Sequence, residues 1–204
     1  MQQTIRSNDM VFLAGQTGSG KTTAAKFLLR LCDRLIVIDP KANMDETWDL
    51  VEADERKKRA LLDGKAARLH FIPPVDMPDG YYREIFALAM DAGNVILYID
   101  EMYAVFPPGA KPSDPLVMTW TRGREFGVGT WGATQRPTWI PLFSMSESQH
   151  FFCFRLMLED DRDRMASLMG RDVQRPVPDE HGFWYRGVRD PAPKYFTRME
   201  IESK

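Results

Sequence analysis

Short apolar runs alternate along the chain with longer amphipathic or polar stretches, as is typical of an α/β protein. Six apolar runs predict buried strands at residues 10–14, 35–39, 68–72, 94–99, 128–134 and 149–154. Apolar residues at helical spacing predict a helix at residues 21–31, and further helices are expected at residues 45–63, 81–92, 114–125 and 159–169. The tail alternates at residues 182–188 and 194–201 around a turn with two prolines, which predicts a terminal β-hairpin.

The composition is that of a globular chain. Hydrophobic residues make up 44% of the 204 positions, enough to bury a core and to exclude wholesale disorder. No repeat, low-complexity tract or linker divides the chain. We expect a single domain over residues 1–204, with a core over roughly residues 8–175 and a β-hairpin over roughly residues 180–202.

Charge and cysteine content exclude further classes. The 27 basic and 29 acidic residues give a net charge of -2, so any binding of anions must be local. Cys32 and Cys153 lack ligand-spaced partners, which excludes a zinc site or a disulfide framework. No signal peptide and no apolar run of about 20 residues is present, so we expect an intracellular protein without a transmembrane segment of its own.

Residues 15–22 read GQTGSGKT, a full match to G-x-x-x-x-G-K-[ST] between a predicted strand and a predicted helix. Glycines let such a loop turn tightly and point its N–H groups at phosphate oxygens. Lys21 should reach the β- and γ-phosphates of ATP, and the Thr22 hydroxyl should bind Mg²⁺. The expected nucleotide-binding residues are Gly15, Gln16, Thr17, Gly18, Ser19, Gly20, Lys21, Thr22 and Thr23.

Two acidic residues follow the strongest predicted strand. Asp100 ends the run LYID, where a parallel strand meets the ligand-binding edge of an open sheet, and there it could hold Mg²⁺. Glu101 is placed to activate a water for attack on the γ-phosphate. A strand-capping Asp–Glu pair on a solvated turn is the alternative interpretation.

Gln135 ends another predicted strand, within the run GATQRP. Neighbouring parallel strands end at the same edge, so its amide could sense the γ-phosphate or position the water. Alternatively, Gln135 satisfies a backbone group at a strand end.

Three segments together resemble the FtsK/HerA superfamily of DNA-pumping ATPases: GQTGSGKTT, VIDPK and GREFGVGTWGATQRP, with LYIDE as the Walker B motif. The resemblance spans most of residues 10–170 and is greatest to viral genome-packaging ATPases for double-stranded DNA. It implies a RecA-like P-loop NTPase of the additional-strand, catalytic-glutamate class, with a mainly parallel central sheet sandwiched by helices. The chain resembles the motor core alone, without the membrane segments, DNA-reading domain or N-terminal barrel of cellular relatives.

The resemblance further implies ATP and Mg²⁺ as ligands, double-stranded DNA as substrate, and a homo-oligomeric ring, either a pentamer or a hexamer. A capsid or portal-vertex protein is a further expected partner, and the host cytoplasm or the packaging vertex of the virion is the expected location. Nucleotide would then lie between subunits, with an arginine supplied in trans by Arg122 or Arg124, or failing these by Arg136. An ordinary surface position is the alternative for each arginine.

DNA contacts are expected at Lys41 and at Lys111, which lies in a proline-rich loop after the Walker B motif. A basic cluster at residues 56–59 (RKKR) is a further candidate, although nearby acidic residues also fit an ordinary solvated helix. Other functions remain open on sequence grounds: another FtsK/HerA-type DNA pump, a Zot-like morphogenesis ATPase, or a P-loop kinase for small molecules.

Overall fold

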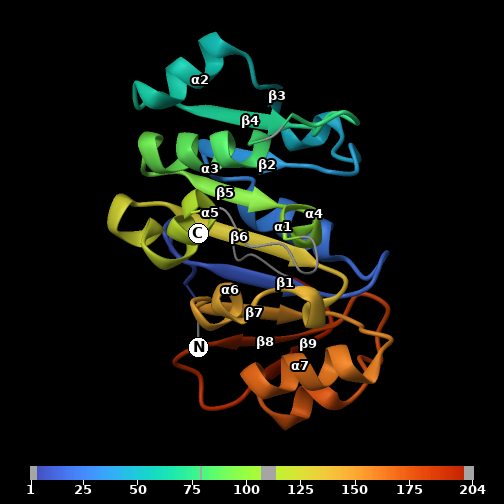
Figure 1. Ribbon diagram of the computed structural model, residues 1–204. Coiled ribbons are helices and arrows are strands. Elements are labelled where there is room, and N and C mark those ends of the chain that lie inside the picture. The colour runs from blue at the N-terminus through green and yellow to red at the C-terminus, as the bar shows by residue number, and fades with distance from the viewer. Residues whose placement is uncertain (1–3, 79, 107–113, 200–204) are drawn as a thin grey trace.

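A computed structural model describes residues 4–78, 80–106 and 114–199. One nine-stranded sheet runs through the molecule in the order β3-β4-β2-β5-β6-β1-β7-β8-β9 (Figure 1). The pairs from β3 to β7 are all parallel, whereas β8 and β9 are antiparallel additions at one edge. The strands are β1 (Val11–Ala14), β2 (Arg34–Ile38), β3 (Val51–Glu52), β4 (Ala67–Phe71), β5 (Ile96–Ile99), β6 (Gly129–Thr134), β7 (His150–Cys153), β8 (Phe183–Gly187) and β9 (Lys194–Phe196).

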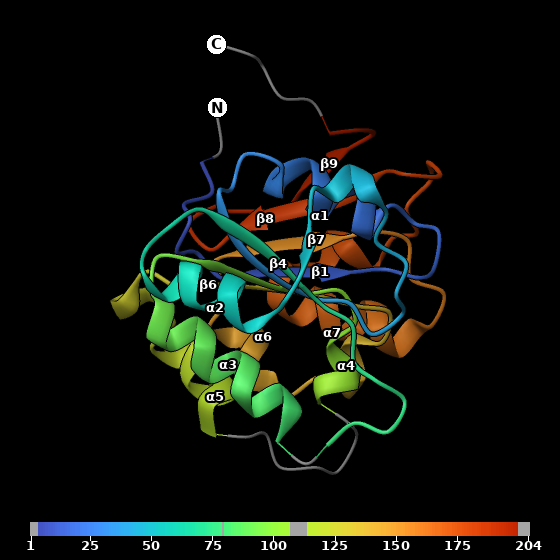
Figure 2. The ribbon, with the colours of Figure 1, turned by 90° about the horizontal axis from the view of Figure 1, so that it is seen from above.

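Helices cover both faces of the sheet, as Figure 2 shows from above. One face carries α1 (Lys21–Leu29) and the short 3₁₀ helix η1 (Glu46–Trp48). The helices of the other face are α2 (Glu55–Leu62), α3 (Tyr81–Ala92), α4 (Met102–Val105), α5 (Asp114–Thr121), α6 (Leu142–Ser146) and α7 (Glu159–Met169). Further 3₁₀ turns are η2 (Gly123–Phe126), η3 (Pro137–Trp139) and η4 (Arg171–Gln174).

The hydrophobic core therefore has two layers, one on each face of the sheet. Each buried strand contributes apolar side chains to both layers, because its successive side chains point to alternate faces. In β1, Phe12 and Ala14 belong to the cluster under α3 and α5, whereas Val11 and Leu13 belong to the cluster under α1. Successive strand residues point to opposite faces, so a continuously apolar strand is what a sheet covered on both sides requires.

The strand order confirms the predicted fold class. β6 lies between the strand that precedes the glycine-rich loop (β1) and the strand that precedes Asp100 (β5), which is the additional-strand arrangement. Because β2, β5, β6, β1 and β7 are parallel, their carboxyl ends meet at one edge of the sheet. The predicted C-terminal hairpin is present as β8 and β9.

The helix predicted over residues 45–63 is wrong for its first half. There the chain forms η1, then the short edge strand β3, and only then α2. Asp49 adopts a left-handed conformation at φ 53°, which ends the first turn. The Asp54 side chain accepts a hydrogen bond from the Lys57 backbone N–H, so the helix starts there with an N-cap.

Two other expectations need adjustment. The helix predicted over residues 114–125 ends at Thr121, and Gly123 begins a separate 3₁₀ turn. Most of the proline-rich loop after the Walker B segment lies outside the described residues. Within the described ranges, none of the helices is long and apolar enough to cross a membrane.

Candidate nucleotide site

The glycine-rich loop connects β1 to α1 at the carboxyl edge of the sheet. The Gly15 N–H donates to Thr134 O at 3.1 Å and the Gln16 N–H to Arg155 O at 2.9 Å, which ties the loop to the ends of two neighbouring strands. A Cβ at position 15 would lie 2.6 Å from Phe154 Cβ, so only glycine fits there. The loop is therefore held in a fixed shape from both sides.

Three loop residues show what the turn requires and what it leaves without a partner. Gly20 adopts φ 100° immediately before α1, in the region that favours glycine. Gln16 Oε1 and Ser19 Oγ are buried, and neither finds a hydrogen-bond partner among the described residues. Buried polar atoms normally have partners, so these two favour a polar ligand in the loop.

Lys21, the first residue of α1, is almost fully buried, with its Nζ 3.0 Å from Gln16 O. Burial lowers the pKa of its ammonium group to about 8, although Glu101 and Asp100 partly oppose the shift. A buried cation at a helix N-terminus favours an anion, because both the charge and the free N–H groups gain a partner.

Asp100 follows β5 and contacts the first turn of α1. Its Oδ1 accepts hydrogen bonds from Thr22 Oγ1 at 2.9 Å and from Tyr98 OH at 2.6 Å. Burial is the main cause of the raised pKa of its carboxyl group. A hydroxyl and a carboxylate side by side are ligand types that Mg²⁺ accepts.

Among the described residues, no cluster of three or more His, Cys, Asp or Glu could bind a metal alone. Mg²⁺ does not need such a cluster, because it usually takes one or two protein oxygens together with water and substrate phosphates.

Glu101 is the centre of a second set of contacts and is only 1% exposed. Its Oε2 accepts hydrogen bonds from Gln135 Nε2 at 2.8 Å and from Lys41 Nζ at 2.9 Å. Gln135 Oε1 in turn accepts one from Thr17 Oγ1 at 2.7 Å. The loop after β1, the end of β5 and the end of β6 are thus joined through side chains.

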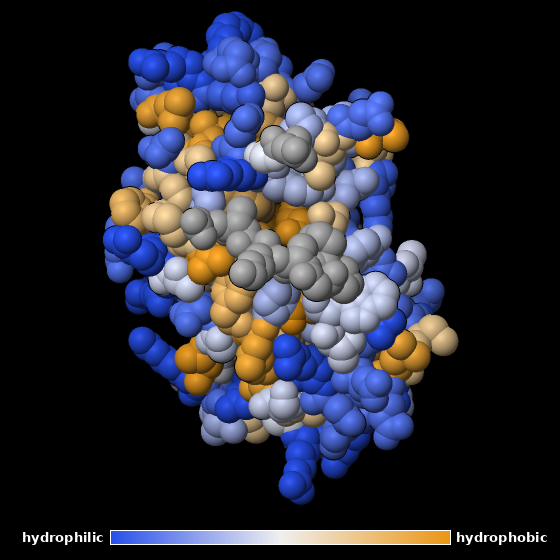
Figure 3. Space-filling model, viewed as in Figure 1, coloured by the Kyte–Doolittle hydropathy of each residue, from blue (hydrophilic) through white to orange (hydrophobic). Residues whose placement is uncertain are grey.

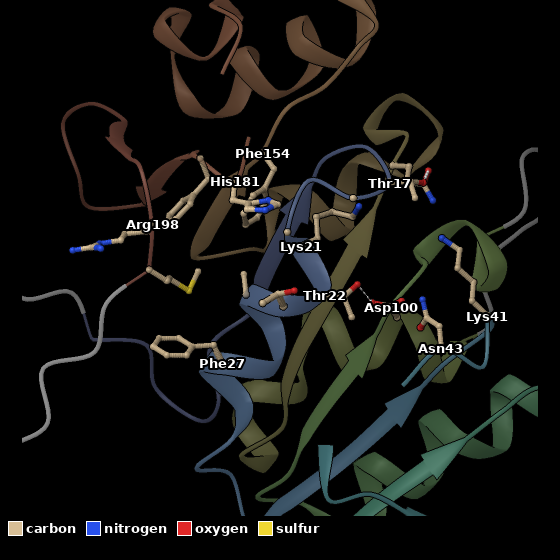
Figure 4. A pocket seen from close by; sticks show the side chains of 17 residues that line it. Thr17, Lys21, Thr22, Phe27, Lys41, Asn43, Asp100, Phe154, His181 and Arg198 are labelled. Atoms are coloured by element: carbon tan, nitrogen blue, oxygen red, sulfur yellow. Dashed lines mark hydrogen bonds between the residues drawn. The ribbon is translucent and has the colours of Figure 1, made fainter. Parts of the chain in front are cut away.

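The cavity at this edge has a volume of about 460 Å³ and falls into two halves (Figure 4). That volume lies within the range of small-molecule sites. Thr17, Lys41 and Asp100 lie on one side of α1, and Thr23 also contributes to the lining. The other half is lined by aromatic and C-terminal residues that the sequence analysis did not identify: Phe27, Phe154, His181, Phe183, Arg198 and Met199.

The structure places Arg122 and Arg124 before β6, at the end of the sheet opposite the glycine-rich loop. Arg122 Nη2 lies 3.2 Å from Glu125 Oε2, and Arg124 Nη2 lies 3.7 Å from Asp9 Oδ1. Neither lines the cavity of its own chain.

Arg136 directly follows Gln135, but its side chain contacts other residues of its own chain. Its Nε donates to Asp161 Oδ2 at 2.7 Å, and its guanidinium lies 4.5 Å from the centre of the Trp139 ring.

Of the expected DNA contacts, Lys41 lies in the cavity beside Glu101, and Lys111 lies outside the described residues. The basic cluster of α2 is largely paired: Lys57 with Asp54 at 3.5 Å, and Lys58 with Glu55 at 2.8 Å. Hydrophilic residues gather over α2 and α7, at opposite ends of the face in Figure 3.

Comparison with known proteins identifies relatives of the chain. No protein-family model matches it. Over 169 residues it is 28% identical to the DNA packaging ATPase P9 of Enterobacteria phage PRD1. The aligned region covers 81% of this chain and 72% of that protein.

Solved structures share the fold. The genome packaging NTPase B204 of Sulfolobus turreted icosahedral virus 2, in complex with sulfate, superposes with a TM-score of 0.79 at 16% identity. This match covers 97% of our chain and all of B204. The pCW3 conjugation coupling protein TcpA gives a TM-score of 0.59 at 15% identity, over 92% of our chain and 60% of TcpA. The chain is thus similar in sequence to a viral DNA packaging ATPase, and it shares the fold of a viral genome packaging NTPase.

Proposed function

We propose that this protein hydrolyses ATP to move double-stranded DNA during the packaging of a viral genome. The observation that carries the proposal is the meeting of Lys21, Asp100, Glu101 and Gln135 at one edge of the sheet, in a homologue of a DNA packaging ATPase. Glu101 favours hydrolysis over phosphoryl transfer to a small acceptor, because a kinase has less use for a water-activating carboxylate.

Each residue at this edge has a proposed role. The N–H groups of the glycine-rich loop and the Lys21 ammonium bind the β- and γ-phosphates. Thr22 and Asp100 hold Mg²⁺, which neutralises phosphate charge when bound. Glu101 accepts a proton from the attacking water, and Gln135 links Glu101 to Thr17 of the loop. Gln135 would thereby report the state of the γ-phosphate site.

The proposed assembly is a pentameric or hexameric ring with the nucleotide site at the interface between subunits. Arg122 and Arg124, which lie away from the cavity of their own chain, could reach the site of a neighbour. Lys41 and Lys111 are the proposed contacts to DNA phosphates. A capsid or portal-vertex protein is the proposed docking partner, with the ring in the host cytoplasm or at the packaging vertex.

The proposal is tested by measuring ATP turnover with and without duplex DNA on protein separated by size. We expect turnover in an oligomeric fraction, and a rise when duplex DNA is added. If no fraction hydrolyses ATP, the proposed ATPase activity is wrong. If duplex DNA leaves turnover unchanged, the proposed movement of DNA is wrong, whereas the ATPase activity stands.

The arginine in trans has its own test, in which Lys21→Ala subunits are mixed with Arg124→Ala subunits. Each variant alone should be inactive, because loss of an arginine finger lowers kcat by about 10³–10⁵. The mixture should recover turnover, since some interfaces then combine an intact loop with an intact arginine. The same mixture with Arg122→Ala assigns the role to one of the two arginines, and failure of both mixtures would exclude them.

A further inference from the structure

The edge of the sheet opposite the glycine-rich loop carries a cluster of buried polar side chains that the proposed mechanism does not use. Asp9 precedes β1, His150 begins β7 and Tyr185 lies in β8. These three residues are between 3% and 7% exposed. Arg124, in η2 before β6, contacts the cluster from outside. The parallel strands in Figure 1 point away from this edge, so the cluster lies at their amino ends.

A chain of hydrogen bonds fixes the Asp9 carboxylate. Its Oδ2 accepts a hydrogen bond from the Arg6 backbone N–H at 2.8 Å and lies 3.2 Å from His150 Nε2. A carboxylate only accepts, so Nε2 carries the hydrogen of this pair. Burial lowers the pKa of His150, which favours the neutral imidazole, and its Nδ1 then accepts a hydrogen bond from Tyr185 OH at 2.7 Å. The Asp9 carboxylate is therefore held by its own segment and by β7, with β8 behind.

The backbone that carries Arg124 is fixed as well. The Arg124 carbonyl accepts a hydrogen bond from the Gly127 N–H at 3.2 Å, which closes η2 just before β6. A Cβ at Gly129, the first residue of β6, would lie 3.0 Å from Asp9 O, so the segment before β1 packs directly on the start of β6. Asp9 and Arg124 thus approach each other from two segments in tight contact.

Arg124 and Arg122 differ in what holds them. Among the described residues, Arg124 forms one ion pair, from Nη2 to Asp9 Oδ1 at 3.7 Å, and its side chain stays 46% exposed. Most of its five N–H donors are therefore free for an acceptor on another subunit. Arg122 instead donates to Glu125 from Nε and Nη2, at 3.4 and 3.2 Å, and lies over the Phe126 ring. Glu125 thus occupies the N–H groups that a phosphate would need, and as an exposed residue it fixes the arginine little.

An arginine that acts on the phosphates of a neighbouring subunit must be placed accurately, because an error of about 1 Å can cost a factor of 10² in rate. The arginine side chain is long and loses much rotamer freedom when it is ordered. A buried carboxylate that contacts one Nη atom supplies this order in advance and leaves the other donors uncovered.

We propose that Asp9, held by His150, is a positioning residue for Arg124, and that Arg124 rather than Arg122 is the arginine supplied in trans. The inference deepens the proposed function and rests on it, because it requires a ring whose nucleotide sites lie between subunits. Through Tyr185, the C-terminal hairpin becomes part of the support for this arginine.

The first test compares the carboxylate partners of the two arginines. Asp9→Asn should lower kcat about tenfold to a hundredfold at an unchanged KM, because the glycine-rich loop still binds nucleotide while the guanidinium loses its orientation. Glu125→Gln removes the carboxylate partner of Arg122 and is the matched control. It should leave kcat within about twofold, as expected for an exposed ion pair.

Mixed rings then distinguish positioning from a structural role. Asp9→Asn subunits are mixed in equal amounts with Lys21→Ala subunits, whose own site is inactive but whose arginine is intact. Turnover per Asp9→Asn subunit should rise about fivefold or more, since half of its sites then face an intact donor. The double variant Lys21→Ala/Asp9→Asn should give no such rise. Wild type mixed with Lys21→Ala is the reference, because it measures any loss that inactive subunits cause.

A second pair of variants acts through His150, and thermal melting shows whether each variant is folded. His150→Phe removes the donor to Asp9 and fills a similar volume. It should lower kcat about threefold to tenfold, with the same recovery on addition of Lys21→Ala subunits. His150→Gln offers an amide N–H in place of Nε2 and should retain more of the rate. If Asp9→Asn does not fold, His150→Phe and its recovery decide in its place.

Three results would overturn the inference while wild-type turnover, and with it the proposed function, stands. The first is a wild-type kcat in Asp9→Asn, and the second is a loss in Glu125→Gln as large as that in Asp9→Asn. The third is the same response to Lys21→Ala subunits as to the double variant, which would mean that Asp9 acts within its own subunit. Failure of the proposed function looks different, because the wild type itself then shows no turnover in any fraction, and the role of Asp9 falls with it.

Discussion

The two halves of the nucleotide cavity are built in opposite ways. The phosphate half consists of charged and polar side chains close to one another in short motifs, and several of them are buried at an energetic cost. The aromatic half consists of residues from α1, from the segment after β7 and from the C-terminal hairpin and its flanks, and its buried rings belong to the core. The contrast teaches that the residues of one half serve chemistry at the phosphates, whereas those of the other half serve mainly the packing of the core.

The sharpest test of this division is Glu101→Gln, which should remove turnover and spare binding. Loss of a general base lowers the rate about 10²–10⁴-fold, whereas the amide keeps the shape of the side chain. Single-turnover hydrolysis and nucleotide binding are the measurements. Glu147→Gln, at an exposed glutamate, is the control and should leave both unchanged. Normal turnover in Glu101→Gln would show that another group activates the water.

Phe154→Ala addresses the aromatic half and should act on stability. Phe154 is 2% exposed, so its truncation leaves a cavity and lowers the free energy of unfolding by about 3–5 kcal/mol. Phe196→Ala is the control: its ring is 38% exposed at the end of β9, and its loss should have a clearly smaller effect. Chemical denaturation measures both. Equal effects would mean that the aromatic half is not part of the core.

Lys21→Met should raise the free energy of unfolding of the nucleotide-free protein, the opposite of the effect of Phe154→Ala. Burial lowers the pKa of Lys21 from 10.5 to about 8, so the charged form is disfavoured in the folded state. The corresponding cost is up to about 3 kcal/mol at neutral pH. It is fully present below pH 8 and disappears as the pH rises from about 8 to 10.5, because the folded protein then releases the proton first.

The measurement is the free energy of unfolding of wild type and Lys21→Met between pH 7 and pH 10. Their difference should shrink with rising pH, and nucleotide binding should be lost in the variant at every pH. A variant less stable than the wild type at pH 7 would contradict the interpretation of Lys21 as a buried charge that requires an anion.

The smallest expected effect is that of Lys41→Met, which separates two roles for one residue. Lys41 is about one-third exposed, and its pair with Glu101 is worth at most about 1 kcal/mol, or roughly fivefold in turnover without DNA. If Lys41 instead binds DNA, the variant should lose the stimulation by DNA and keep its basal rate. Lys65→Met, at an exposed lysine outside the cavity, is the control. Turnover with and without DNA distinguishes the two roles.

The regular elements could be predicted because their local pattern agrees with their environment. The helices at residues 81–92 and 159–169 have the predicted bounds, as both are amphipathic and followed by glycine. Residues 45–54 could not be predicted in this way. Their charged composition fits a helix, but the left-handed Asp49 and the pairing of β3 with β4 depend on the neighbouring strand.

The phosphate half could be predicted for a similar reason. Its residues lie at strand ends that a parallel sheet must bring together, so motif and topology suffice to place Lys21, Asp100, Glu101 and Gln135. Lys41 was predicted as a DNA contact and not as a residue of this edge. Its contact with Glu101 depends on the loop that follows β2.

The sequence by itself determined the fold class, the glycine-rich loop and the acidic pair, because each rests on a short local pattern with a physical reason for its spacing. Only the tertiary structure decided that the C-terminal hairpin lines the nucleotide cavity and that Arg122 and Arg124 lie far from it. These relations join segments far apart in the sequence, such as the hairpin and the glycine-rich loop. They depend on packing between elements, which leaves no periodicity or motif along the chain.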